Sequence, residues 1–119
     1  MKIYPITPVA KPRMTQRDKW AKRPAVLKYR AFKDECKLRQ VALAESFRVI
    51  FYIPMPESWS EKKKQRLDGT PCKAKPDIDN LCKALMDAVL PDDSAVWHIQ
   101  AYKIYARQGA IGIELDETV

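Results

Sequence analysis

The residues best suited to chemistry in this sequence are acidic and lie in one short stretch, residues 75–93. The stretch contains five aspartates and, after Lys75, a single basic residue, Lys83, although the chain has a formal net charge of +7. Clustered carboxylates repel one another, so each resists ionisation unless a cation offsets the charge. Oxygen ligands of this kind suit the hard divalent cations Mg²⁺ and Mn²⁺. The stretch is therefore a candidate metal site for hydrolytic chemistry.

A helix is predicted directly after the first two of these aspartates. Pro76 is tolerated just before a helix, and Asp77 or Asp79 can cap the amino terminus. Between residues 79 and 89 the apolar residues recur at helical spacing and form a stripe suited to burial. These residues are Leu81, Leu85, Ala88 and Val89, and Leu90–Pro91 ends the helix.

This helix is expected to place its charged residues on the side exposed to solvent. Asp79 and Lys83 are four residues apart and share the face opposite the apolar stripe. Asp92 and Asp93 follow the helix in a loop or at a strand start. We expect the helix start and the loop after the helix to bring Asp77, Asp79 and Asp93 together, with Lys83 beside them. The alternative is that the aspartates are ordinary caps and a turn, and that Lys83 forms a surface pair.

Composition narrows the class of protein. A length of 119 residues predicts one domain, and a sequence pI of about 9.4 favours a polyanionic partner, most simply nucleic acid. No apolar run is long enough to span a membrane and no signal-peptide core is visible, so we expect a cytoplasmic protein. Three widely spaced cysteines are typical of reduced thiols. The single histidine, His98, excludes a His-rich metal site within one chain and would have to carry any Ser–His or Cys–His chemistry alone.

The rest of the chain predicts the elements that must position the acidic stretch. In chain order we expect a strand at 2–7, a helix at 26–45, a strand at 47–53, a short helix from a Ser60 cap to residue 67, and strands at 96–106 and 110–115. The last two strands are separated by three residues that include Gly109, and this predicts a hairpin. The predicted fold is α+β, a single domain over residues 1–119 with a mixed or antiparallel sheet and helices packed on one face.

Basic residues before the acidic stretch predict contacts with phosphate. Residues 8–24 form a loop rich in Pro and basic side chains, which cannot bury enough surface to fold alone. We interpret it as a phosphate-binding arm whose Trp20 is suited to stacking on an exposed base; the alternative is a solvated loop. A second basic run at 62–66 precedes the aspartates. The candidate DNA-binding residues are Lys11, Arg13, Arg17, Lys19, Lys73 and Lys75.

The acidic stretch also carries a family resemblance. Residues 75–88 read Lys-Pro-Asp-Ile-Asp-Asn-Leu-Cys-Lys-Ala-Leu-Met-Asp-Ala, and residues 92–96 read Asp-Asp-Ser-Ala-Val. This pattern resembles the RusA family of Holliday junction resolvases, small endodeoxyribonucleases associated with phages and prophages. Residues 11–20 and 56–64 also resemble phage members. The resemblance implies a homodimer in a bacterial or phage-infected cell that cuts branched DNA, specifically four-way junctions, during recombination and repair. It also implies hydrolysis that depends on Mg²⁺, with Mn²⁺ as a substitute, without a small-molecule cofactor.

The resemblance assigns roles to individual residues of the acidic stretch. Asp77 and Asp79 match the first two metal-binding aspartates of the family, and Asp93, with Asp92 as its neighbour, matches the third. Lys83 matches a lysine that the family needs for cleavage. The family pattern has a longer, Gly-containing connection between the helix and the Asp-Asp pair, where this chain has only Leu90–Pro91. Which of the two aspartates after the helix points into the site is therefore left open.

Two other classes of function compete with this interpretation. The first is a non-catalytic, structure-selective DNA-binding protein whose aspartates are only caps and turns. The second is a metal nuclease that acts on other branched or on linear DNA. A protein of the membrane surface fits less well, because no basic amphipathic helix with a clean apolar face stands out.

Overall fold

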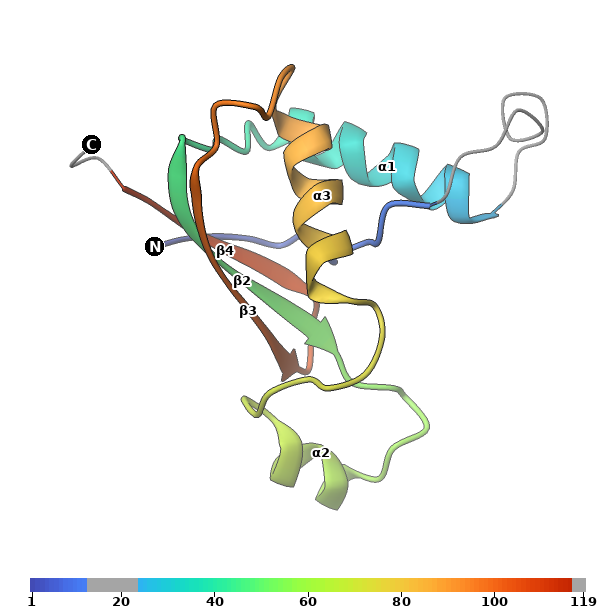
Figure 1. Ribbon diagram of the computed structural model, residues 1–119. Coiled ribbons are helices and arrows are strands. Elements are labelled where there is room, and N and C mark those ends of the chain that lie inside the picture. The colour runs from blue at the N-terminus through green and yellow to red at the C-terminus, as the bar shows by residue number, and fades with distance from the viewer. Residues whose placement is uncertain (13–23, 117–119) are drawn as a thin grey trace.

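Four strands form one mixed sheet in the computed structural model, which describes residues 1–12 and 24–116 (Figure 1). The strands lie side by side in the order β1 (Lys2–Tyr4), β4 (Ala110–Leu115), β2 (Ser46–Pro54) and β3 (His98–Ala106). β2 pairs antiparallel with β4 and parallel with β3, and β1 pairs antiparallel with β4. The α+β class and the mixed sheet are confirmed.

One face of the sheet forms the core together with two helices. Alternate residues of β2, namely Phe47, Val49 and Phe51, are buried on this face because they are large or β-branched and point the same way. They cluster with α1 (Pro24–Leu38), through Tyr29, Phe32 and Cys36, and with α3 (Ile78–Val89), through Leu81, Ala84 and Leu85. Figure 1 shows α1 and α3 on the same side of the sheet, as predicted. No helix of the described ranges is both long enough and apolar enough to cross a bilayer.

The predicted hairpin between the last two strands is wrong. β3 and β4 lie on opposite sides of β2, where Ile50 has Tyr102 of β3 as its partner on one side and Gly112 of β4 on the other. Residues 107–109 therefore cross over the end of β2, where the Met55 amide donates to the Ala106 carbonyl (2.9 Å). The crossing spans two strand spacings, about 10 Å, which a three-residue connection can reach. A short loop limits the distance between strands but does not make them partners.

Helix α1 is shorter than predicted. It begins at Pro24, which fits the first turn of a helix, but it ends at Leu38 rather than near residue 45. Gln40 adopts a left-handed backbone with φ of 54°. The Gln40 amide donates to Lys37 and the Val41 amide donates to Cys36, which is the hydrogen-bond pattern of a Schellman motif. Because Gln replaces the usual Gly, the sequence carried no signal for this end.

The segment between β2 and β3 carries the other two helices. Helix α2 (Glu61–Leu67) begins at Ser60, whose hydroxyl accepts from the Lys63 amide (3.2 Å), as predicted. It buries none of its residues and projects away from the sheet, so only α1 and α3 cover the core face (Figure 1). Residues 69–72 then run along the outer edge of β3, where the Cys72 amide donates to the Lys103 carbonyl (2.8 Å). This covers an otherwise open strand edge and delivers the chain to the start of α3.

Candidate functional site

Asp77 and Asp79 are exposed carboxylates at the amino terminus of α3. Asp77 occupies the N-cap position, and its backbone carbonyl accepts the first helical hydrogen bond, from the Leu81 amide (3.1 Å). Its side chain makes no capping hydrogen bond, so the cap predicted for this carboxylate does not form. Asp79 lies in the first helical turn. Both carboxylates are thus available to a cation at a point where the helix dipole also favours negative charge.

Cys82 follows the two aspartates in α3 and is half-buried. Burial of Cys82, and secondarily the charge of Asp79, raises the pKa of the Cys82 thiol. A neutral thiol is a poor metal ligand, because metal binding to cysteine requires the thiolate. The side chains exposed at the start of α3 that could hold a cation are the carboxylates of Asp77 and Asp79, and oxygen ligands are the preference of Mg²⁺.

Lys83 lies one helical turn after Asp79 and is exposed. Asp87, one turn further along the same face, is half-buried and forms an ion pair with Lys11. Lys11 was predicted to bind DNA, but its ammonium group is occupied in fixing the segment before α1 against α3. Lys83, by contrast, is exposed on the same face of α3 as Asp79, and its part in a site stays a prediction.

The loop that carries Asp77 is held in place by a lysine that sequence reasoning missed. The Lys103 ammonium of β3 donates to the carbonyls of Ala74 and Pro76, the latter at 2.7 Å. Lys103 pairs with Phe51 across the sheet and so occupies the face that α3 covers. A lysine at a covered position of a strand is unusual, since a buried ammonium needs partners. The position of Lys103 on the covered face of a strand was the one feature of the sequence that could have indicated this contact.

Asp92 and Asp93 lie at the opposite end of α3, as Figure 1 shows for the connection between α3 and β3. From Val89 onward the chain leads away from the helix towards β3 and does not return along α3 (Figure 1). The Asp92 carboxylate accepts from the Ser94 amide (3.0 Å), a bond that lowers the pKa of Asp92 and makes it part of a turn.

The structure consequently does not bring Asp93 to the other two aspartates. In the part of the chain that the structure describes, no group of three or more His, Cys, Asp or Glu side chains is arranged to hold a metal ion. The expected three-aspartate cluster is reduced to Asp77 and Asp79, with Lys83 one helical turn after Asp79. The chain after Leu90–Pro91 leads into β3 instead of returning to the start of α3, and this connection is also where the sequence departs from the family pattern.

Comparison with known families decides the class of protein. Residues 5–116 match the family model described as Endodeoxyribonuclease RusA, nearly the whole chain. The chain belongs to the RusA family. Its members are Holliday junction resolvases, so membership makes the protein an endodeoxyribonuclease that binds branched DNA. No curated protein and no solved structure gives a significant match.

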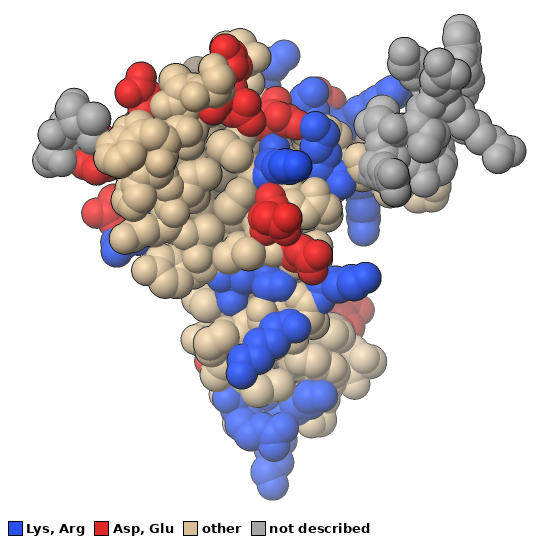
Figure 2. All heavy atoms as spheres, in the orientation of Figure 1, with Lys and Arg blue, Asp and Glu red and all other residues tan. Residues whose placement is uncertain are grey.

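Basic side chains surround the acidic pair in this RusA-family chain. Lys73 and Lys75 are exposed on the segment that leads into Asp77. Figure 2 shows acidic side chains near the start of α3 with Lys and Arg side chains below them, continuing to the tip of the molecule over α2. This pattern suits a phosphate backbone crossing the carboxylates. Three further predicted DNA contacts, Arg13, Arg17 and Lys19, lie outside the described residues, as does Trp20.

Helix α2 is fixed to the sheet of this RusA-family protein by aromatic and ionic contacts. Trp59 packs edge-on against Tyr105 of β3, with ring centroids 5.2 Å apart, and the Lys63 ammonium lies 4.1 Å from the Trp59 ring. Arg107 forms two hydrogen bonds with the Glu61 carboxylate. The basic residues of α2 are therefore presented on an anchored helix rather than on a loose loop.

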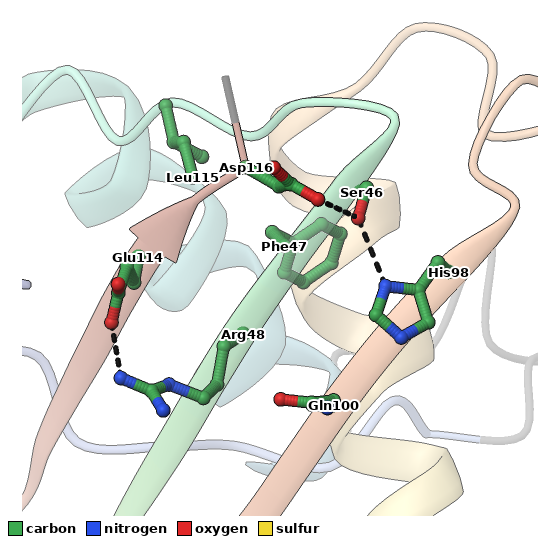
Figure 3. Close-up of a pocket in the computed structure, with 8 residues that line it drawn as sticks. All are labelled: Ser46, Phe47, Arg48, His98, Gln100, Glu114, Leu115 and Asp116. Atoms are coloured by element: carbon green, nitrogen blue, oxygen red, sulfur yellow. Dashed lines mark hydrogen bonds and ion pairs between the residues drawn. The ribbon is translucent and has the colours of Figure 1, made fainter. Parts of the chain in front are cut away.

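His98 forms a structural contact rather than a nucleophilic site. The Ser46 hydroxyl lies 2.9 Å from His98 Nδ1 and donates to Asp116 Oδ2 at 3.2 Å, as Figure 3 shows. The serine stands between the histidine and the aspartate, whereas a catalytic triad places the histidine in the middle. Ser46 is also only 1% exposed, so its oxygen cannot reach a substrate. The three residues join the ends of β2, β3 and β4.

Proposed function

We propose that this RusA-family protein is a Mg²⁺-dependent endonuclease that resolves four-way DNA junctions in recombination and repair by paired phosphodiester hydrolysis. The observation that carries the proposal is the pair Asp77 and Asp79. Both carboxylates are exposed at the start of α3, neither is consumed by a described capping bond, and basic residues flank them. The family match over residues 5–116 supplies the class of substrate.

The donor set at the start of α3 fits Mg²⁺, with Mn²⁺ as a substitute. Mg²⁺ in nucleotide and nucleic-acid enzymes is commonly bound by one or two carboxylates and completes its shell with water and substrate phosphate. Asp77 and Asp79 would hold the ion through their carboxylate oxygens. When bound, the ion supplies a water of lowered pKa and offsets negative charge on the phosphate. No small-molecule cofactor is required for this chemistry.

The basic residues near the pair have separate tasks. Lys83 neutralises the charge that develops on the non-bridging phosphate oxygens in the transition state. Lys73 and Lys75 bind the DNA backbone without reading sequence and set the path of the strand across the carboxylates.

The proposal includes a homodimer and leaves one residue to be tested. Resolution of a four-way junction needs two symmetric nicks, and two copies related by a two-fold axis supply two sites. Asp93 is the third metal ligand by the family pattern, but a contact with Asp77 would require residues 90–97 to rearrange. The geometry therefore supports Asp77 and Asp79 as the principal ligands.

The test is cleavage of a labelled synthetic four-way junction, with and without Mg²⁺, by the wild type and by Asp79→Asn and Asp93→Asn. Asp34→Asn, an exposed aspartate on α1, is the matched control. We expect paired Mg²⁺-dependent nicks that are lost in Asp79→Asn while junction binding survives, and substantial cleavage by Asp93→Asn. Equal loss in both variants would show that the connection after α3 rearranges in the active complex.

Two outcomes would reject the proposal. Tight junction binding without cleavage in either Mg²⁺ or Mn²⁺ would make the chain a structure-selective binding protein. Equal cleavage of four-way, three-way and linear DNA would make it a nuclease of broader specificity.

A further inference from the structure

A pocket of about 460 Å³ lies between α2 and β3, beside the connection that leads from α2 to α3 (Figure 1). Its volume falls in the range of about 300–1,000 Å³ that is typical of sites for small organic groups. We call it the α2 pocket and define it by the residues that line it, which are Leu67, Thr70, Pro71, Lys73, Ala74 and Tyr105.

The walls of the α2 pocket are fixed by hydrogen bonds of the backbone. Residues 69–72 follow the outer edge of β3, where the Tyr105 amide donates to the Thr70 carbonyl (2.9 Å). The Lys103 ammonium donates to the Ala74 carbonyl. One wall of the pocket is therefore held by the same lysine that anchors the loop before α3.

The lining of the α2 pocket suits a flat, uncharged ring that carries a negative group beside it. Tyr105 supplies an aromatic ring, and Leu67 and Pro71 supply aliphatic surface. Among the described residues that line the pocket, Lys73 is basic and exposed, and none is acidic. A nucleotide of a DNA strand has the matching composition, because its base stacks on aromatic surface and its phosphate pairs with an ammonium group.

The α2 pocket is close to the proposed cleavage site. Ala74 is three residue steps from Asp77, and such a segment spans at most about 11 Å. Each strand of duplex DNA rises about 3.4 Å per nucleotide. A base in the pocket would thus belong to a nucleotide within about three of the phosphate at the Asp77–Asp79 pair.

We propose that the α2 pocket binds one unstacked base of the DNA substrate, with the phosphate of the same nucleotide on Lys73. The inference rests on the proposed function and deepens it, because it names the part of the substrate that this surface recognises. Taking a base out of a stacked duplex is costly, and the cost is lower where stacking is already interrupted, as it is where four strands exchange. The α2 pocket would therefore favour cleavage at a branch point over cleavage within a linear duplex.

The decisive experiment locates the base by photochemical cross-linking. Four-way junctions carry a single 5-iodouracil at successive positions around the branch point, and the Asp79→Asn variant keeps the bound DNA intact. Near-ultraviolet light couples 5-iodouracil to an aromatic side chain in contact with it, with loss of HI, and mass spectrometry identifies the residue. We expect one position near the branch point to cross-link to Tyr105, and a 5-iodouracil at the far end of an arm to give no such product.

A variant that fills the α2 pocket tests its part in cleavage. Ala74→Phe adds a ring to the pocket and removes no polar group. It is expected to abolish the cross-link to Tyr105 and to lower the single-turnover rate of junction cleavage about tenfold, a loss typical of one stacked base. Ala42→Phe makes the same change at an exposed position between α1 and β2 and is the matched control. Both variants should need the same Mg²⁺ concentration for half-maximal cleavage, because neither alters Asp77 or Asp79.

The outcomes separate this inference from the proposed nuclease. Cross-links that avoid Tyr105 at every position, or an Ala74→Phe variant that is folded by thermal unfolding and cleaves as fast as Ala42→Phe, would overturn the α2 pocket as a base site. A cross-link to Tyr105 that Ala74→Phe abolishes, in a chain whose wild type does not cleave, would keep the base site and reject the proposed function.

Discussion

Replacement of Lys103 by Met is expected to weaken cleavage by loosening the loop that carries Asp77. Met keeps most of the aliphatic length of Lys but removes the ammonium group that donates to the Ala74 and Pro76 carbonyls. A hydrogen bond to a charged group contributes about 1.5–3 kcal/mol when it is shielded from water. The bond to Ala74 is exposed and that to Pro76 is partly buried, so we count only the second, at about 2 kcal/mol.

A loss of about 2 kcal/mol corresponds to a roughly thirtyfold larger population with the loop undocked. Because Asp77 follows directly after Pro76, an undocked loop separates the two carboxylates of the pair. The Mg²⁺ concentration that gives half-maximal single-turnover cleavage should therefore rise by up to about thirtyfold. The rate at saturating Mg²⁺ should change little, because excess ion restores the docked state.

The assay is single-turnover cleavage of a four-way junction across a Mg²⁺ titration. Lys37→Met, an exposed lysine in the last turn of α1, controls for the loss of one positive charge. Lys103→Arg retains donors and should recover part of the Mg²⁺ affinity. The reasoning would be refuted if Lys103→Met and Lys37→Met showed the same Mg²⁺ dependence, or if Lys103→Met lowered only the rate at saturating Mg²⁺.

Three further predictions concern stability and DNA binding. Leu85 of α3 is fully buried, so Leu85→Ala should lower the free energy of unfolding in urea by about 2–5 kcal/mol, whereas Ile78→Ala at an exposed position should cost far less. Burial raises the pKa of the Cys36 thiol to about 11 from its ordinary value of 9.0. The folded state keeps its full stability below pH 9, where the thiol is protonated in both states. As the pH rises from 9 to 11 the unfolded chain loses this proton first, so the free energy of unfolding falls. Cys36→Ala should accordingly flatten the alkaline loss of stability measured by circular dichroism, while Tyr29, whose pKa burial raises to about 12, still contributes above pH 10. Lys62→Ala and Arg66→Ala on α2 should each reduce the slope of log affinity against log salt by about one without changing the preference for junctions.

Local features of this chain were readable from sequence because neighbouring residues determine them. Strand β2 follows from alternating aromatic and β-branched residues, and α2 from its Ser60 cap. The position of Asp77 and Asp79 at the start of α3 follows from Pro76 and the apolar stripe behind it. Each of these features depends on fewer than about a dozen consecutive residues, which is the range over which periodicity and capping act.

The features that sequence reasoning missed depend on residues far apart or on conformations without a characteristic residue. The sheet order could not be read from residues 107–109, because loop length does not state which strand lies between β3 and β4. The end of α1 was missed because Gln40 adopts the left-handed conformation usually taken by Gly. The contact of Lys103 with residues 74–76 joins distant segments. The place of Asp93 depends on the path that the chain takes from α3 to β3 rather than on residue type.

The strand order also determines when this protein can become an enzyme during its synthesis. Both neighbours of β2 are made after it, and β1 pairs with β4, so the sheet closes only when residues 110–115 have left the ribosome. A nascent chain that ends after α3 presents the apolar sides of α1, β2 and α3 without the strands that complete the core, a state in which association with chaperones or other chains competes with folding. The same chain lacks Lys103 and therefore the anchor of the Asp77 loop. Nuclease activity should thus arise only after residues 110–115 have been synthesised and have paired with β1 and β2.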